Sequence, residues 1–322
     1  MIAARVHTCV IVALFTVASC RNGERPMPSA TPPSKTFSAF TPLRDGFNQA
    51  IAPGNQIVTL GAGATWWQDD APVMVALPPN TPVDGAQWTA DGASLRVGLG
   101  TLDLAARTWR AEPALEAWNR PGPRGEHPVR AVAWSSDASH VALLLEARSP
   151  DGKRTAEVAI ASAADGRERG RRELAGASKL IASGDRVLVA AATPVVLDLD
   201  AKVIAQPSPV PDSVVRVREG SGMFAAVGVA GAVALIHPAD GNVVASWDAH
   251  AVDAVPVANG LVAIDFEGTV RVGCLDGSGI KTVAEVASGV RAAVIRVVGD
   301  RVIVAGAGAV PVHAARFANP CR

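Results

Sequence analysis

The chain has 322 residues, and 49% of them are apolar, which excludes a protein that is disordered throughout. Thirty basic residues balance thirty acidic ones, so the chain has no long-range attraction for nucleic acid, which requires clustered Lys and Arg. Large all-β folds hold a chain of this length in a single domain.

The first nineteen residues have the features of an export signal. Arg5 gives a positively charged start, and residues 9–18 are apolar except for Thr16. This apolar stretch is too short to span a bilayer, which takes about 20 residues, but it suits the central part of a signal peptide. We therefore predict a signal peptide over residues 1–19.

The signal ends in Val17-Ala18-Ser19-Cys20. This ending resembles the bacterial lipobox, in which a Cys receives lipid and becomes the new N-terminus. The resemblance implies lipidation of Cys20 and a place in the cell envelope. Arg21 favours the outer membrane, because an Asp at that position commonly holds Gram-negative lipoproteins at the inner membrane. The alternative interpretation is an ordinary secretory signal with an incidental Cys20.

Residues 20–41 are rich in Pro, Ser and Thr and show no apolar period. Such a segment cannot bury enough surface to offset the entropy lost on ordering. We therefore predict a flexible tether over residues 20–41, followed by one folded domain over residues 42–322.

Beyond the tether, a turn followed by a short apolar run recurs along the chain. The closest copies begin at Gly184 and Gly299, where Gly-Asp-Arg precedes the apolar run. The seven copies begin at residues 54, 92, 138, 184, 222, 260 and 299. Their spacing, between 38 and 46 residues, is the period of a four-stranded propeller blade.

The interior of each copy also indicates strands. Pairs such as Asp91-Gly92 and Asp240-Gly241 separate the apolar runs and favour tight hairpins, and no long helical period occurs. We predict an all-β fold, a seven-bladed β-propeller of four-stranded antiparallel blades. Six or eight blades remain open, as does an open β-solenoid, although solenoid coils are usually shorter than these units.

Two stretches resemble the WD-repeat family. Residues 231–250 follow its order of apolar strand, turn, further strand and loop His, and residues 267–272 resemble its Asp-Gly-Thr-Val-Arg-Leu strand. The Trp-Asp ending is missing, because Ile236-His237 and Gly273-Cys274 stand in its place. The resemblance implies a WD-like or quinoprotein-like bacterial propeller. In architecture alone it extends to the propeller subunit of the outer-membrane barrel-assembly machinery.

The sequence carries no recognisable motif for catalysis, a cofactor or a metal. The mature chain has no pair of histidines at ligand spacing, no Cys-x-x-Cys and no Gly-x-Ser-x-Gly. We therefore predict no catalytic, cofactor-binding or metal-binding residues, and a non-catalytic scaffold that binds a protein partner.

The alternative function is a periplasmic propeller enzyme, such as a quinoprotein-like dehydrogenase or a lactonase-like hydrolase. The catalytic residues of such an enzyme would be scattered over the loops of several blades. Convergent acids and histidines at the mouth of the central channel would favour the enzyme, whereas a lining of Ala, Val and Gly would favour the scaffold.

The second and third units are longer than most of the others, and their extra length falls in residues 110–127 and 147–172. Insertions in propeller repeats lie in loops on one face, and Trp and Arg are enriched at binding hot spots. The candidate partner-binding residues are Trp109, Trp118, Arg120, Arg124, Arg167, Arg169, Arg171 and Arg172. Alternatively, the Trp side chains pack under the loops and the arginines form a solvated strand edge.

Two cysteines remain once Cys9 is removed with the signal and Cys20 is lipidated. Outside the cytoplasm such a leftover pair usually closes into a disulfide. Cys274 belongs to the sixth unit and Cys321 to the end of the seventh, so adjacent blades would place them close together. We predict a Cys274–Cys321 disulfide, with two free thiols as the alternative.

Overall fold

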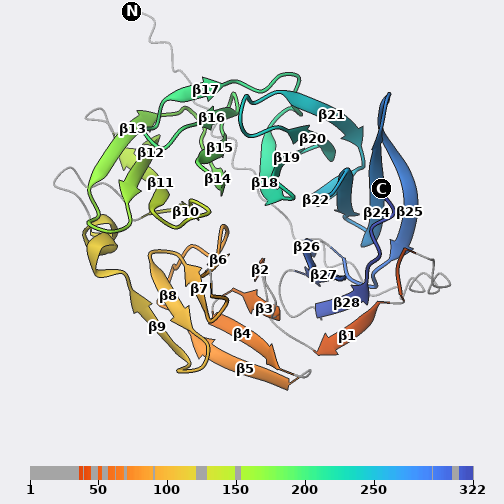
Figure 1. The fold of residues 1–322 in the computed structure, drawn as a ribbon, viewed down its shortest axis with the longest axis horizontal. Helices are drawn as coiled ribbons and strands as arrows, with labels where there is room; N and C mark the ends of the chain where they lie inside the picture. The colour runs from red at the N-terminus through yellow and green to blue at the C-terminus, as the bar shows by residue number, and fades with distance from the viewer. Residues whose placement is uncertain are drawn as a thin grey trace, which may run out of the picture.

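The computed structural model describes residues 36–38, 40–44, 50–52, 57–61, 63–68, 71–89, 91–120, 129–148, 154–291, 293–306 and 312–321. The described strands form seven four-stranded antiparallel sheets, arranged as blades around a central axis (Figure 1). The predicted seven-bladed propeller is therefore confirmed. The signal peptide, Cys20 and most of the predicted tether lie outside the described residues.

The first four blades follow one another along the chain. Blade 1 contains β2 (Ala50–Ala52), β3 (Ile57–Leu60), β4 (Gly63–Gln68) and β5 (Ala71–Ala76). Blade 2 contains β6 (Gln87–Trp88), β7 (Ser94–Val97), β8 (Gly100–Asp103) and β9 (Thr108–Ala111). Blade 3 contains β10 (Ala131–Trp134), β11 (His140–Arg148), β12 (Arg154–Ser162) and β13 (Glu168–Glu173). Blade 4 contains β14 (Lys179–Ser183), β15 (Arg186–Ala190), β16 (Val195–Leu197) and β17 (Val203–Ala205).

Blades 5 and 6 continue this order, and blade 7 joins the two ends of the domain. Blade 5 contains β18 (Val214–Gly220), β19 (Met223–Gly228), β20 (Ala232–Ile236) and β21 (Val243–Asp248). Blade 6 contains β22 (Ala251–Val257), β23 (Gly260–Asp265), β24 (Thr269–Asp276) and β25 (Gly279–Ala287). Blade 7 contains β26 (Ala293–Val298), β27 (Arg301–Gly306) and β28 (Val312–Arg316), with β1 (Thr41–Arg44) as its fourth strand.

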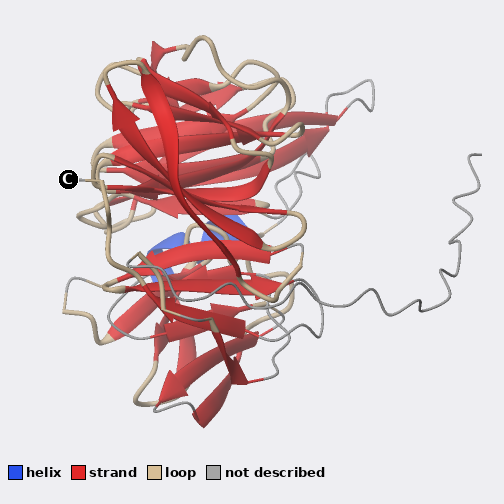
Figure 2. Cartoon of the chain, turned by 90° about the vertical axis from the view of Figure 1, so that its right-hand side faces the viewer, coloured by secondary structure: helices blue, strands red, loops and turns tan. Residues whose placement is uncertain are grey.

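Strands make up nearly the whole body when the disc is seen from the side (Figure 2). The one helix among the described residues is a short 3-10 helix, η1 (Pro113–Asn119), at the rim between β9 and β13 (Figure 1). No helix in the described ranges is long and apolar enough to cross a membrane.

The repeated turns join the first and second strands of successive blades. Gly92, Gly184, Gly222 and Gly299 all occupy this position with positive φ angles, which glycine adopts without steric cost. The seven-fold period of the sequence is therefore the period of this hairpin.

Each blade is apolar on both faces because it packs between two others. In β15, the buried Val187 and Val189 pack with residues of blade 3. The alternate residues, Leu188 and Ala190, pack with residues of blade 5. Since successive strand residues point to opposite faces, one short strand serves two cores. Full burial of a side chain such as Leu188 contributes about 2 kcal/mol.

The two long units are built differently from the prediction. We expected both insertions in loops, but much of residues 147–172 is strand, because β12 runs for 9 residues and β13 for 6. Residues 158–161 of β12 are apolar and fully buried in succession, which suits a strand that packs on both faces. In the first insertion, residues 113–119 form η1.

The ring closes where an early segment of the chain pairs with a late one. Strand β1 pairs antiparallel with β28, and Phe37 forms an isolated bridge with Phe317. Phe37 is only 2% exposed, and its ring lies 5.4 Å from that of Phe317. Phe37 falls within residues 20–41, which we predicted to be a flexible tether. Because its side chain is buried against Phe317, this last part of the predicted tether packs on blade 7.

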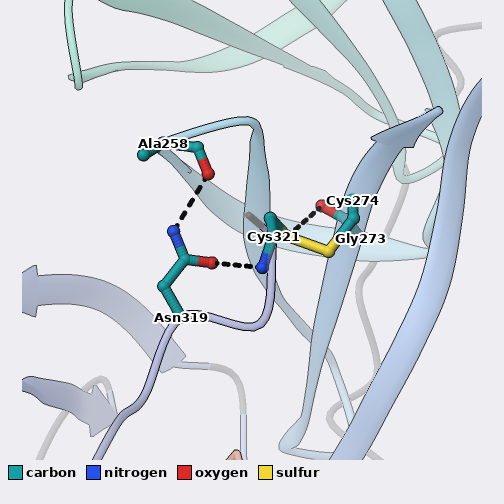
Figure 3. Close-up of a disulfide and its surroundings, with 5 residues drawn as sticks. All are labelled: Ala258, Gly273, Cys274, Asn319 and Cys321. Carbon is teal, nitrogen blue, oxygen red and sulfur yellow. Dashed lines mark hydrogen bonds between the residues drawn. A yellow bond between two sulfur atoms is a disulfide. The ribbon is translucent and has the colours of Figure 1, made fainter.

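A disulfide ties the C-terminal segment to blade 6. Cys274 in β24 is bonded to Cys321, with 5.1 Å between their Cα atoms (Figure 3). Asn319 supports this bond, since its Nδ2 donates to the Ala258 carbonyl at 2.9 Å and its Oδ1 accepts from the Cys321 backbone N–H at 3.0 Å. A Cβ at Gly260 would lie 2.8 Å from the Cys321 sulfur, so the close approach of β23 to the disulfide requires glycine at this position.

The disulfide should stabilise the domain mainly by restricting the unfolded chain. It spans a sequence separation of 47 residues. We expect the Cys274→Ala/Cys321→Ala variant to lose roughly 3–4 kcal/mol of unfolding free energy in urea titrations. Mass spectrometry of the non-reduced wild type should show a joined peptide pair, and two freely alkylated cysteines would contradict the assignment.

Candidate partner-binding surface and central channel

The candidate partner-binding residues lie along the rim of blades 2 and 3. Trp109 is on β9 and Trp118 is in η1. The arginines on β13, the outermost strand of blade 3, are Arg169, Arg171 and Arg172. Arg120 directly follows η1, Arg167 directly precedes β13, and Arg124 lies outside the described residues.

The structure brings the two insertions together through Trp118. Its indole Nε1 donates to the Gly166 carbonyl, in the turn before β13, at 2.9 Å. The guanidinium of Arg171 lies over the same ring, 5.7 Å from its centroid. Trp109 is used within its own blade, where its Nε1 donates to the Val97 carbonyl at 3.1 Å. Both indoles therefore have a packing role.

Three of the described arginines of this rim form ion pairs. Arg171 contacts Glu157 and Glu168, each at 2.8 Å, and the hydrogen bond that Arg171 donates to Glu168 is the main cause that raises the pKa of Arg171. Arg169 pairs with Asp200 at 3.1 Å, and Arg120 pairs with Glu116 at 2.9 Å. The rim is thus a ladder of alternating charges on an exposed strand, rather than a single concave site.

A central channel forms a hollow in the described part of the chain. Its wall comes from β6, β10, β14, β18, β22 and β26, the first strands of six blades, which face the axis (Figure 1). The cavity has a volume of about 310 Å³. Val, Ala and Gly make up much of the lining, and its ionisable members are Arg218, Glu219 and Arg296.

One buried carboxylate organises the charges beside this cavity. Asp253 on β22 is fully buried, and its oxygens accept from Arg218 Nε at 2.9 Å and Arg296 Nη1 at 3.3 Å. The backbone N–H of Ile295 also donates to Asp253, at 3.1 Å. Burial by itself raises the pKa of Asp253, but the positive charges of Arg218 and Arg296 outweigh it, so the pKa lies below its ordinary value.

Asp84 and Lys179 form a second pair near the same cluster. Lys179 Nζ lies 2.7 Å from Asp84 Oδ2. Burial raises the pKa of Asp84, but the charges of Arg218 and Lys179 together lower it to about 2. Burial is also the main cause that lowers the pKa of Arg296 to about 10, followed by the charge of Arg218. Arg296 therefore stays protonated at neutral pH.

Sequence reasoning missed this cluster. Arg218, Asp253 and Arg296 belong to the first strands of blades 5, 6 and 7. Asp253 and Arg296 are each the one charged residue of an apolar strand, whereas β18 also contains Arg216 and Glu219. The available signal was a charged residue inside an apolar run close to a repeated turn. In the described part of the chain, no group of His, Cys, Asp and Glu side chains stands ready to hold a metal ion.

Comparison with known proteins identifies the class of the fold. No protein-family model matches the chain, and no curated protein sequence matches it. BamB from Moraxella catarrhalis aligns with a TM-score of 0.53 and 11% identity, over 86% of this chain and 100% of that chain. A chain of the mitotic checkpoint complex gives 0.62 and 13%, over 98% of this chain and 100% of that chain. The WD40 repeats of RRP9 give 0.61 and 12%, over 90% of this chain and 99% of that chain. These similarities show the fold alone, which is a β-propeller.

The Asp84 pair should make stability depend on pH. Asp84 has an ordinary pKa of 3.8 and a folded pKa of about 2, so its contribution is present above pH 4 and is lost as the pH falls toward 2. At pH 7 we expect Asp84→Asn to lower the unfolding free energy by about 2 kcal/mol, and at pH 2 by little.

Urea titrations at several pH values measure this difference. Asp185→Asn is the matched control, because Asp185 pairs with Arg186 on the surface and its side chain is 69% exposed. That variant should change stability little at either pH. A loss for Asp84→Asn that stays constant from pH 7 to pH 2 would contradict the ionic role.

Proposed function

We propose that this protein is an exported lipoprotein, anchored through Cys20 in the outer membrane, whose propeller acts as a non-catalytic scaffold for a protein partner. The observation that carries the proposal is the Val17-Ala18-Ser19-Cys20 ending of the signal, followed by a Pro/Ser-rich segment and a rigid propeller. Lipidation at Cys20 would hold the propeller at the membrane, facing the periplasm or the cell surface.

Two further observations support the scaffold. Solved neighbours of the same fold include a chain of a protein assembly, the mitotic checkpoint complex. The lining of the channel is largely Val, Ala and Gly and, among its described residues, contains no histidine. By the criterion set out from the sequence, the Val, Ala and Gly of this lining favour the scaffold, whereas Glu219 in the lining and Asp253 beside it are acids of the kind that the enzyme alternative requires.

Replacement of Cys20 by Ser tests the anchor. This change removes the thiol that would be acylated, so the product should lose labelling by a fatty-acid probe and leave the membrane fraction. Cys321→Ser serves as the control, because it removes a disulfide-bonded cysteine and keeps the Cys20 thiol, so it should leave labelling intact. Unchanged membrane partitioning of Cys20→Ser would contradict the lipid anchor.

The rim of blades 2 and 3 is the proposed partner surface, and charge reversal tests it. We expect Arg167→Glu/Arg169→Glu to reduce partner capture from envelope extracts about tenfold or more. Because the Arg169–Asp200 pair is half exposed, the melting temperature should change by less than about 4 °C.

Lys281→Glu is the matched control for this surface. Lys281 is an exposed residue of β25, the outer strand of blade 6, so its reversal changes charge away from the proposed surface. Equal capture by the wild type and both variants would place the partner surface elsewhere.

A further inference from the structure

The channel cluster carries a surplus of buried positive charge. Arg218 is 6% exposed and Arg296 is 8% exposed, and they share the single carboxylate of Asp253. The nearby Asp84 is already paired with Lys179. Glu219, the acid of the cavity wall, accepts from Ser183 Oγ at 3.4 Å and takes no part in the Arg218–Asp253–Arg296 contacts. Within those contacts two guanidiniums share one carboxylate, so their charges are not balanced pair for pair, which is costly for buried groups.

The two guanidiniums use their donors differently. Arg218 donates from both Nε and Nη2 to one oxygen, Oδ2 of Asp253, at 3.2 and 3.1 Å. Arg296 reaches Asp253 and the Ile295 carbonyl through Nη1 alone, at 3.3 and 2.6 Å. Among the described residues, Nε and Nη2 of Arg296 have no acceptor. These two N–H groups share one edge of the guanidinium, and this edge matches the two oxygens of a carboxylate.

The cavity that Arg296 helps to line suits a small organic molecule. Arg296 is part of its wall, and the volume of about 310 Å³ is at the lower end of the range for small-molecule sites. The surrounding wall includes Val83, Ala133, Ala182 and Val255, which offer apolar contacts. A ligand that fits both features has one carboxylate and an apolar body.

We propose that the central channel binds a small carboxylate with an apolar body, held bidentately by Nε and Nη2 of Arg296. The negative charge of the ligand would balance the surplus of the Arg218–Asp253–Arg296 cluster. Such a carboxylate belongs either to a free organic acid or to the C-terminal residue of a partner chain. This inference depends neither on the lipid anchor nor on the rim surface.

Calorimetric titration of the intact domain with hexanoate tests the proposal, with hexanamide as the uncharged probe. We expect saturable binding of hexanoate to one site and no binding of hexanamide. Arg296→Lys keeps the positive charge but loses the two parallel N–H donors of the guanidinium, so it should weaken hexanoate binding about tenfold or more. Arg130→Lys is the control, because Arg130 is an exposed residue paired with Glu146, and it should bind like the wild type.

Several results would overturn the proposal. These are no saturable binding of hexanoate, equal binding of hexanamide, or equal affinity in Arg296→Lys and the wild type. If Arg296→Lys does not fold, nitrogen NMR of the wild type decides, since the Arg296 Nε resonance should shift with hexanoate and stay in place with hexanamide. An unshifted resonance on addition of hexanoate would also overturn it.

Two peptide probes distinguish the sources of the carboxylate. One is a tripeptide that ends in valine with a free carboxylate, and the other is the same tripeptide as its C-terminal amide. Tighter binding of the peptide acid than of hexanoate, with no binding of the amide, assigns the site to a chain terminus. Binding of hexanoate without the peptide acid assigns it to a free organic acid.

Discussion

The pairing of β1 with β28 closes the ring, and the remainder of the fold depends on this closure. Every blade is apolar on both faces, so each needs a neighbour on either side. Blade 7 packs on blade 6 through the cluster that contains Val262, Ile295 and Phe37, and β2 of blade 1 contacts β26 and β27 on its other side. An open ring would expose these apolar faces to water, which is a cause of aggregation. The N-terminal strand and the disulfide therefore hold the two ends of the domain to the same part of the ring.

Closure also explains the charges in the channel. The first strands of all blades converge on the axis, and residues from three blades meet around Asp253. In such a narrow space a charged side chain is not fully hydrated, so each charge depends on its neighbours for compensation. The same geometry that buries Arg218 and Arg296 creates the cavity beside them. A structural ion cluster and a candidate ligand site are thus consequences of one constraint.

Much of the fold could be predicted because its signal is local and periodic. The turn at Gly184 and its counterparts lie in a hairpin whose two strands are adjacent in sequence, so the repeat predicts the number of blades directly. The disulfide was predictable from the count of cysteines and the adjacency of blades 6 and 7. Strand β1 was not, because its Thr-Pro-Leu-Arg segment follows a Pro/Ser-rich stretch and pairs with residues more than 260 positions away.

The sites were harder to predict than the fold. Trp118 and Arg171 were predicted to bind a partner, and the structure places them in contact with each other. Trp118 is packed under the turn before β13, and Arg171 is paired with Glu157, so both side chains already have partners within the chain. The channel cluster escaped notice because Arg218, Asp253 and Arg296 are separated by 35 and 43 residues. They come into contact because the first strands of blades 5, 6 and 7 meet at the axis of the propeller, and a local sequence pattern does not indicate such a contact.

Hydrogen exchange of the intact protein, followed by mass spectrometry, tests ring closure most directly. If β1 is an integral strand of blade 7, backbone N–H groups in residues 36–44 should be protected to the same degree as those of β28. Exchange of residues 36–44 at the rate of an unstructured peptide, with β28 still protected, would show that the ring is not closed by this strand.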